Sequence, residues 1–281
     1  MKGFILAAGL GTRLKPITDF IPKPLVPIFD VTPLDICIQR IIQTGASDIS
    51  INTHHLSEKI SKHLSKKNYA NINISFERDK ILGVGGGIGK LKKYFAGDNV
   101  LVYNADIVSN MPLDELIDFH KTNGNWATLG LVKNKPTDIV LFDESNSITS
   151  FEDKKKNGFT FSGISIISEE IYSQLPEDEF YNIIDLYKKI IKSPDSFRIK
   201  GLLFDNVFWS DIGNPKSYMD LWTNINQNEG FFEYFGISQN SKEYKIFNEC
   251  KSIFINSQYN CNINNSLVFM NKIIQQLSNS S

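Results

Sequence analysis

The chain has 281 residues, and 30 lysines and arginines against 31 aspartates and glutamates leave a net charge of −1. This even balance argues against broad nucleic-acid binding and against attachment to a membrane surface through basic residues, since both usually need a strongly basic face. A hydrophobic content of 41% with 22% charged residues is typical of a globular protein and excludes a disordered chain.

Signals for targeting and for disulfides are weak. The three cysteines, Cys37, Cys250 and Cys261, are too few and too widely spaced for a disulfide framework or a zinc site, which favours a reducing compartment. The apolar run at residues 4–8 is too short for the core of a signal peptide, and no stretch approaches the roughly 20 apolar residues of a membrane span. We therefore expect a cytoplasmic protein with no membrane and no nucleic-acid partner.

The first half of the chain alternates short apolar runs with helical patterns. The apolar runs are typical of buried strands and lie at residues 4–8, 49–52, 72–76 and 100–103. Thr32 and Pro33 supply a cap and a first-turn proline, and Gly45 ends the helix that they start. Further helices are expected at residues 57–64, at residues 87–95 and after residue 112. This alternation predicts a Rossmann-like α/β fold of three layers, with a mostly parallel sheet covered on both faces.

The second half contains more strands, which are expected at residues 127–132, 139–142 and 159–167. One helix follows Ser168, a second occupies residues 182–191, and Asn214 with Pro215 starts a third that runs to about residue 225. Because no linker interrupts residues 1–225, we treat them as one domain.

Residues 226–281 form a C-terminal extension that is rich in Asn and Ser. Four apolar residues in it recur at a six-residue period, namely Ile255, Cys261, Leu267 and Ile273. This spacing suits a partial coil of a parallel β-helix, which would cover a sheet edge or mediate homo-oligomer formation. An irregular hairpin with a frayed end is the alternative.

A glycine-rich loop with two cations follows the first expected strand. Gly9 and Gly11 leave backbone N–H groups free to face phosphate oxygens, while Arg13 can bind phosphate as a fork and Lys23 as a point charge. A dinucleotide-binding fingerprint would need glycine where Leu14 stands, and the Gly-Lys-Ser/Thr of a P-loop is absent from the sequence. The alternative is a turn that carries solvated cations.

A second glycine cluster, at residues 83–89, has five glycines in seven positions and precedes the helix expected at 87–95. Such a cluster costs conformational entropy without adding packing. A ligand or another backbone segment must therefore approach closely, unless the loop is mobile. We expect the planar face of a nucleobase to lie against it.

Two aspartates stand where ligands of α/β sheets usually bind. Asp106 follows the strand expected at residues 100–103, and Asp211 lies between a short apolar strand and a capped helix. Two carboxylates together with phosphates commonly hold Mg²⁺. The alternative for Asp211 is a capping role at the start of the helix.

These motifs resemble the signature of the sugar-1-phosphate nucleotidyltransferase family, Gly-x-Gly-Thr-Arg-Leu-x-Pro-x-Thr followed by Pro-Lys-Pro-Leu. The signature is complete here at Gly9, Gly11, Thr12, Arg13, Leu14, Pro16, Thr18, Pro22, Lys23, Pro24 and Leu25. The likeness extends over about residues 1–225 and is greatest to short members, of the N-acetylmuramate-1-phosphate uridylyltransferase and mannose-1-phosphate guanylyltransferase types. The resemblance implies the fold of the nucleotide-diphospho-sugar transferases.

The resemblance also implies a reaction, in which a nucleoside triphosphate and a sugar 1-phosphate give a nucleotide-sugar and pyrophosphate. It implies that Asp106 and Asp211 hold Mg²⁺, that Arg13 neutralises the departing pyrophosphate, and that Lys23 lies by the α-phosphate or the sugar phosphate. The remaining nucleotide contacts implied by the resemblance are Ala8, Gly9, Gly11, Thr12 and Gly86. The remaining sugar-phosphate contacts implied by the resemblance are Asp153, Lys154 and Gly163.

The sequence departs from the family pattern at two places. Gly83 and Val84 stand where close relatives carry Glu-Thr, and Asp153 with Lys154 only loosely represents the family's Glu-Lys-Pro element, so a solvated charge run is the alternative there. On family likeness we expect UTP with N-acetylmuramate or N-acetylhexosamine 1-phosphate. The alternatives are a mannose- or heptose-1-phosphate guanylyltransferase, a phosphocholine cytidylyltransferase, or a non-catalytic regulatory paralogue that binds a nucleotide-sugar.

Overall fold

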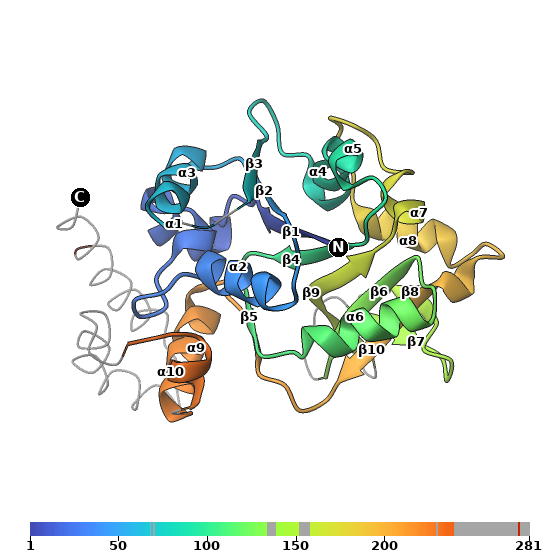
Figure 1. The fold of residues 1–281 in the computed structure, drawn as a ribbon. Coiled ribbons are helices and arrows are strands. Elements are labelled where there is room, and N and C mark those ends of the chain that lie inside the picture. Colours follow the sequence, from blue (N-terminus) through green and yellow to red (C-terminus); the bar gives the residue numbers. More distant parts are fainter. Residues whose placement is uncertain are drawn as a thin grey trace.

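The computed structural model describes residues 1–67, 69, 71–133, 139–151, 158–228, 230–238 and 275. Within these residues, nine strands form one mixed sheet in which β10, β6, β9, β4, β1, β2 and β3 lie side by side, with β7 and β8 attached beside β9 (Figure 1). The strands are β1 (Lys2–Ala7), β2 (Ile49–Thr53), β3 (Ile72–Phe76), β4 (Val100–Asn104), β6 (Ala127–Val132), β7 (Ile139–Phe142), β8 (Ile148–Phe151), β9 (Phe159–Ile167) and β10 (Ile199–Phe204).

Strand direction explains where a site can form. β1 runs parallel to β2 and β4, β2 runs parallel to β3, and β9 lies antiparallel between β4 and β6. Four neighbouring strands therefore end at the same edge of the sheet. A separate antiparallel ribbon of β5 (Ile107–Ser109) and β11 (Trp209–Asp211) lies just beyond the end of β4.

Successive side chains of the central strands point to opposite faces of the sheet, and helices cover both faces, which gives three layers. Phe4 packs into a core cluster on one face of the sheet, and its neighbour Ile5 packs into the cluster on the opposite face. The face of Ile5 is covered by α2 (Pro33–Gln43), α3 (Ser57–Lys66) and α6 (Leu113–Thr122). The face of Phe4 is covered by α4 (Gly83–Lys90), α5 (Lys92–Phe95), α7 (Glu169–Tyr172) and α8 (Ile183–Ile190). The three-layer α/β fold predicted from the sequence is confirmed.

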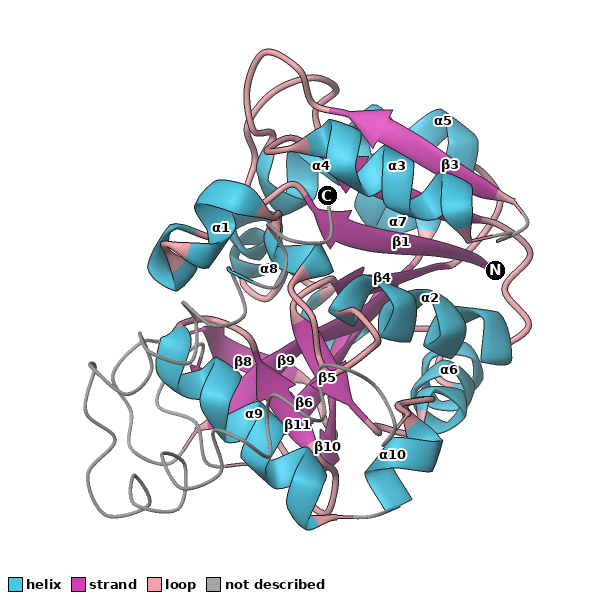
Figure 2. Cartoon of the chain, turned by 90° about the vertical axis from the view of Figure 1, so that its left-hand side faces the viewer, coloured by secondary structure: helices cyan, strands magenta, loops and turns pink. Residues whose placement is uncertain are grey.

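A third cluster fixes the segment that carries the cations. It joins α9 (Pro215–Gln227) and α10 (Gly230–Tyr234) to α1 (Ile17–Phe20) and to the turn at Thr12–Leu14, and the rings of Phe29 and Trp222 at its centre are 4.2 Å apart. Figure 2 shows α9 and α10 at the same end of the molecule as β5 and β11. The segment that follows the glycine-rich loop is thus anchored by this cluster.

Local signals placed most elements correctly, with one error. Thr32 and Asn214 both form capping boxes, each followed by a proline in the first turn of its helix. The helix expected at residues 87–95 is wrong, because α4 begins at Gly83 and α5 follows as a separate element. None of the described helices is both long enough and apolar enough to cross a membrane.

The predicted extension is described only at residues 226–228, 230–238 and 275. Residues 230–238 pack on the domain, with Phe232, Phe235 and Ile237 buried in the third cluster. The hexad residues Ile255, Cys261, Leu267 and Ile273 lie outside the described residues, so the β-helix and the domain boundary remain predictions.

Candidate active site

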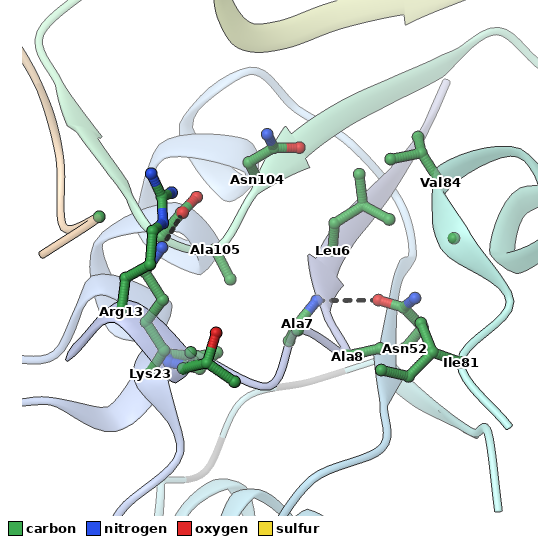
Figure 3. A pocket seen from close by; sticks show the side chains of 17 residues that line it. Leu6, Ala7, Ala8, Arg13, Lys23, Asn52, Ile81, Val84, Asn104 and Ala105 are labelled. Carbon is green, nitrogen blue, oxygen red and sulfur yellow. Dashed lines mark hydrogen bonds and ion pairs between the residues drawn. The ribbon is translucent and has the colours of Figure 1, made fainter. Parts of the chain in front are cut away.

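A cavity of about 320 Å³ opens at the carboxyl edge of the parallel strands (Figure 3). Its walls come from the ends of β1, β2 and β4, from the glycine-rich loop and from the start of α4. The lining residues are Leu6, Ala7, Ala8, Gly9, Gly11, Thr12, Arg13, Lys23, Pro24, Asn52, Ile81, Gly83, Val84, Asn104, Ala105, Asp106 and Gly213. Ligands of open α/β sheets bind at this edge.

The two glycines of the glycine-rich loop, Gly9 and Gly11, lie in different surroundings. Gly11 has a φ of +65°, and a Cβ there would lie 2.8 Å from Cγ2 of Thr18, whose hydroxyl donates a 2.9 Å hydrogen bond to the Gly11 carbonyl. A Cβ at Gly9 would meet no heavy atom within 4 Å. Gly11 is therefore required by the turn itself, whereas Gly9 leaves open space on the cavity side.

Both cations and both aspartates predicted from the sequence meet at one side of the cavity. The ammonium of Lys23 forms an ion pair with Oδ2 of Asp106, and their side chains are 13% and 28% exposed. Gly213 lies between the other two groups, because a Cβ there would lie 2.7 Å from Oδ2 of Asp211 and 3.4 Å from an Nη of Arg13. Arg13, Lys23 and Asp106 thus line this side of the cavity, and Asp211 lies against Gly213, which also lines it.

The ribbon of β5 and β11 brings the two aspartates together. Asp211 pairs with Ile107 in the ribbon, and the backbone N–H of Ile212 donates a 2.9 Å hydrogen bond to the carbonyl of Asp106. The described residues contain no group of three or more His, Cys, Asp or Glu side chains that could hold a metal ion. Two carboxylates on neighbouring backbone segments are a donor set that could hold Mg²⁺ together with phosphate oxygens and water.

The second glycine cluster is a helix, and its glycines serve mainly the packing of protein backbone. A Cβ at Gly86 would lie 2.0 Å from the carbonyl oxygen of Glu179, and one at Gly89 would lie 2.0 Å from that of Pro176. The cavity is lined instead by Gly83 and Val84 at the start of α4. The close approach expected at this cluster is thus made at Gly86 by another backbone segment, and Gly83–Val84 line the cavity; a contact between the base and the backbone of Gly86 stays a prediction.

A second cavity of about 410 Å³ adjoins the first and shares Leu6, Val84 and Asn104 with it. Its other walls come from β4, β7, β8, β9 and α8 and include the polar side chains of Ser165, Asn182 and Lys188. Gly163 supports the boundary between the cavities: it has a φ of +79°, and a Cβ there would lie 2.7 Å from Nδ2 of Asn104. Asp153 and Lys154 lie outside the described residues.

Two lining residues, Asn52 and Asn104, were missed as site residues. Each is a polar residue at the carboxyl end of an apolar strand, which is the same signal that identified Asp106. Asn52 was missed because it belongs to no recognisable motif, and its hydrogen bonds with Ala7 and Glu77 are visible only in the structure.

Comparison with known proteins identifies the class to which this fold and cavity belong. The chain belongs to the nucleotidyl transferase family, whose model matches residues 2–228.

Individual relatives carry more specific names. The chain is 29% identical over 242 residues to UTP–glucose-1-phosphate uridylyltransferase of Synechocystis sp., a match that covers 78% of this chain and 61% of that protein. It is also 29% identical over 230 residues to D-glycero-α-D-manno-heptose 1-phosphate guanylyltransferase of Campylobacter jejuni, covering 80% of this chain and 100% of that protein. The crystal structure of HddC from Yersinia pseudotuberculosis has the same fold, with a TM-score of 0.68 at 24% identity over 80% of this chain and 99% of that chain.

Proposed function

We propose that the protein transfers a nucleotidyl group from a nucleoside triphosphate to a sugar 1-phosphate and releases pyrophosphate. The observation that carries this proposal is the meeting of Arg13, Lys23, Asp106 and Asp211 at one side of a cavity that the glycine-rich loop also lines. Membership of the nucleotidyl transferase family supports the same reaction class.

The proposed step is an in-line displacement at the α-phosphorus. An oxygen of the sugar phosphate forms a bond to the α-phosphorus, the bond from that phosphorus to the bridging oxygen breaks, and pyrophosphate leaves with the electron pair. The protein needs no nucleophile for this step, so its contribution is to position the two substrates and to neutralise their charge. Mg²⁺ held by Asp106 and Asp211 would supply charge neutralisation on the phosphate oxygens.

The distribution of charge along the cavity favours one orientation of the nucleotide. Figure 3 shows Arg13 and Lys23 on one side and Ile81 and Val84 on the other, with Ala8 between them. We place the phosphates by the cations and the base by Gly83–Val84, with the backbone of Ala8 and Gly9 alongside. Lys23 then serves the α-phosphate and Arg13 the departing pyrophosphate.

The acceptor is assigned to the adjoining second cavity, next to Gly163 and Asn104. As donor we propose GTP first, with a heptose or hexose 1-phosphate as acceptor, because the guanylyltransferase of Campylobacter jejuni is matched over its whole length. UTP remains the next candidate, since the Synechocystis relative is named a uridylyltransferase, although the chain spans only 61% of that relative's length. The N-acetylmuramate and N-acetylhexosamine acceptors expected from the sequence stay within the proposal as alternatives, and so does the cytoplasm as the location.

A panel of substrates tests the proposal. Four nucleoside triphosphates are combined with mannose, heptose, glucose and N-acetylated sugar 1-phosphates and with phosphocholine, and pyrophosphate release is followed in the presence of Mg²⁺. Release with at least one sugar 1-phosphate is expected. Release with none of them by a folded protein would contradict the proposal, and tight binding of nucleotide-sugars without turnover would favour a regulatory paralogue.

A further inference from the structure

A chain of buried polar groups runs beneath the wall of the cavity where the base is placed. The backbone N–H of Ala7 donates a 2.8 Å hydrogen bond to Oδ1 of Asn52, and Nδ2 of Asn52 donates a 2.6 Å bond to Oε1 of Glu77. The backbone N–H of Leu82 donates a 2.8 Å bond to Oε2 of the same carboxylate. Figure 3 shows the first link, between Ala7 and Asn52. We call these four residues the buried relay.

The buried relay is costly to form, and each of its side-chain nitrogen and oxygen atoms has a hydrogen-bond partner. Asn52 is 1% exposed and Glu77 is 2% exposed, and each carboxylate oxygen of Glu77 receives one neutral donor. Among the described residues, no lysine or arginine side chain forms an ion pair with this carboxylate. Replacing such a network with apolar side chains of similar volume is often neutral or stabilising, so we attribute this one to the specific arrangement that it enforces.

The buried relay fixes two opposite walls of the cavity relative to each other. Ala7 leads directly into the glycine-rich loop, and Leu82 is the N-cap of α4, immediately before Gly83. The negative charge of Glu77 also interacts favourably with the dipole of α4, because it lies at the N-terminus of that helix.

Gly87 supplies independent support for this role. A Cβ at this position would lie 2.9 Å from Nδ2 of Asn52 and 3.0 Å from Oε1 of Glu77. Glycine at residue 87 therefore leaves the room in which the amide and the carboxylate meet.

We propose that Asn52 and Glu77 are positioning residues that set the separation of the glycine-rich loop from the Gly83–Val84 wall, and thereby the affinity for the nucleotide. This inference rests on the proposed function, since it assumes that a nucleotide occupies the cavity. Neither residue is assigned to the reacting atoms. Their loss should raise the KM for the nucleotide and leave kcat and the KM for the acceptor nearly unchanged.

Two single variants break the buried relay, and their combination restores it. In E77Q an amide group must face one of two donors, either Nδ2 of Asn52 or the N–H of Leu82, so one hydrogen bond is lost. In N52D two carboxylates face each other. In the N52D/E77Q double variant, the amide of Gln donates to the second oxygen of Asp, its carbonyl accepts from Leu82, and Asp still accepts from Ala7. The double variant thus regains all three hydrogen bonds, and the negative charge now lies on residue 52 instead of residue 77.

Nucleotide affinity is measured by titration with the N-methylanthraniloyl derivatives of GTP and UTP, and KM and kcat are measured on the pair of substrates that the panel identifies. E77Q is expected to weaken nucleotide binding about tenfold, which corresponds to one unsatisfied buried group, and N52D at least as much, because two carboxylates face each other. The double variant is expected to recover most of this loss. N125D is the matched control, because Asn125 is also buried and hydrogen-bonded but lies at the opposite edge of the sheet.

Hydrogen exchange of the Ala7 and Leu82 amides in the ligand-free protein provides a readout that does not depend on activity. Exchange should become faster in E77Q and in N52D and slow again in the double variant. If a single variant does not fold, G87A and the double variant carry the test, since G87A pushes the same two side chains apart.

Two results would overturn the inference: unchanged nucleotide affinity in folded single variants, or a double variant no better than either single one. A parent protein that bound no nucleotide would instead remove the proposed function, and this inference with it.

Discussion

Gly9 and Gly86 lack a side chain for opposite reasons. The space beside Gly9 opens on the cavity, whereas the space beside Gly86 is occupied by the backbone of Glu179. Contact with a neighbouring segment therefore explains Gly86, whereas at Gly9 we propose that a ligand takes the open space.

This contrast predicts different results for the same substitution. G9A should unfold at nearly the same temperature as the parent protein but bind nucleotide more weakly, because a methyl group keeps phosphate oxygens from the backbone. G86A should lose about 1–3 kcal/mol of stability or more, since α4 must move away from the segment it contacts. Thermal unfolding and nucleotide titration measure both effects. Parent-like nucleotide affinity in G9A would show that no ligand approaches there.

Asp106 is the carboxylate on which the proposed chemistry depends most. D106N should lower kcat by about 100- to 1,000-fold while the protein still folds, because charge neutralisation by a bound metal is worth several kcal/mol. Steady-state kinetics and circular dichroism measure the two properties. D220N is a matched control, since Asp220 is half exposed and pairs with Lys216 on the surface of α9. Near-normal turnover in D106N would remove Asp106 from the metal site.

At the level of elements, Asp35 joins α2 to α3. Burial by itself raises the pKa of this carboxyl, but hydrogen bonds from His63, Tyr69 and Thr32 together with the charge of His63 outweigh burial and lower the pKa from 3.8 to about 2. Because the unfolded chain binds this proton more readily, Asp35 stabilises the fold at pH values above about 4, and the contribution is lost as the pH falls towards 2.

The expected loss is about 2 kcal/mol between these pH values. Urea unfolding of the parent protein and of D35N at pH 2 to 5 should show the two free energies of unfolding converge as the pH falls. A constant difference across this range would contradict the assignment.

His120 connects α6 to the sheet and should make the stability of the fold depend on pH over a second range. Its ring is 2% exposed, Nδ1 lies 2.9 Å from Oγ1 of Thr128, and burial lowers its pKa from 6.5 to about 4. The unfolded chain again binds the proton more readily, so stability is complete above about pH 6.5 and falls as the pH drops to about 4, by about 3 kcal/mol. H120Q should be less stable at pH 7 but should lack this slope. A parent-like slope in H120Q would assign the effect to another group.

The sequence predicted those elements whose signals are local. The capping boxes at Thr32 and Asn214 and the apolar runs of β3, β6 and β9 depend on residues that are near each other in the chain, so their bounds could be read directly. The bounds of α4 could not be read from the sequence. Its glycines are explained by close contact with residues 176–181, which lie far away in the chain.

The candidate site, too, could be predicted from the sequence only in part. Arg13, Lys23, Asp106 and Asp211 could be named from motifs, but the meeting of the two aspartates depends on the pairing of β5 with β11, which lie about 100 residues apart in the chain. The roles assigned to these four residues remain predictions. Asn52 required the structure, since its contacts with Ala7 and Glu77 cross between strands.

For the whole molecule, the net charge of −1 excludes an extended polyanion but not a compact one. The two cations lie at the same end of the sheet as the two aspartates, so a triphosphate would meet positive charge only locally, and Mg²⁺ would add to it. The two adjoining cavities at this edge would hold donor and acceptor side by side, as a direct displacement requires.

Phosphorus-31 NMR of the protein with Mg²⁺, a nucleoside triphosphate and a sugar 1-phosphate tests this account most directly, because it observes both products. The account predicts that the resonances of a nucleotide-sugar diphosphate and of pyrophosphate grow together with the parent protein, and that neither appears at a comparable rate with D106N or D211N. Failure to form a nucleotide-sugar from any pair, or equal rates in the aspartate variants, would contradict it.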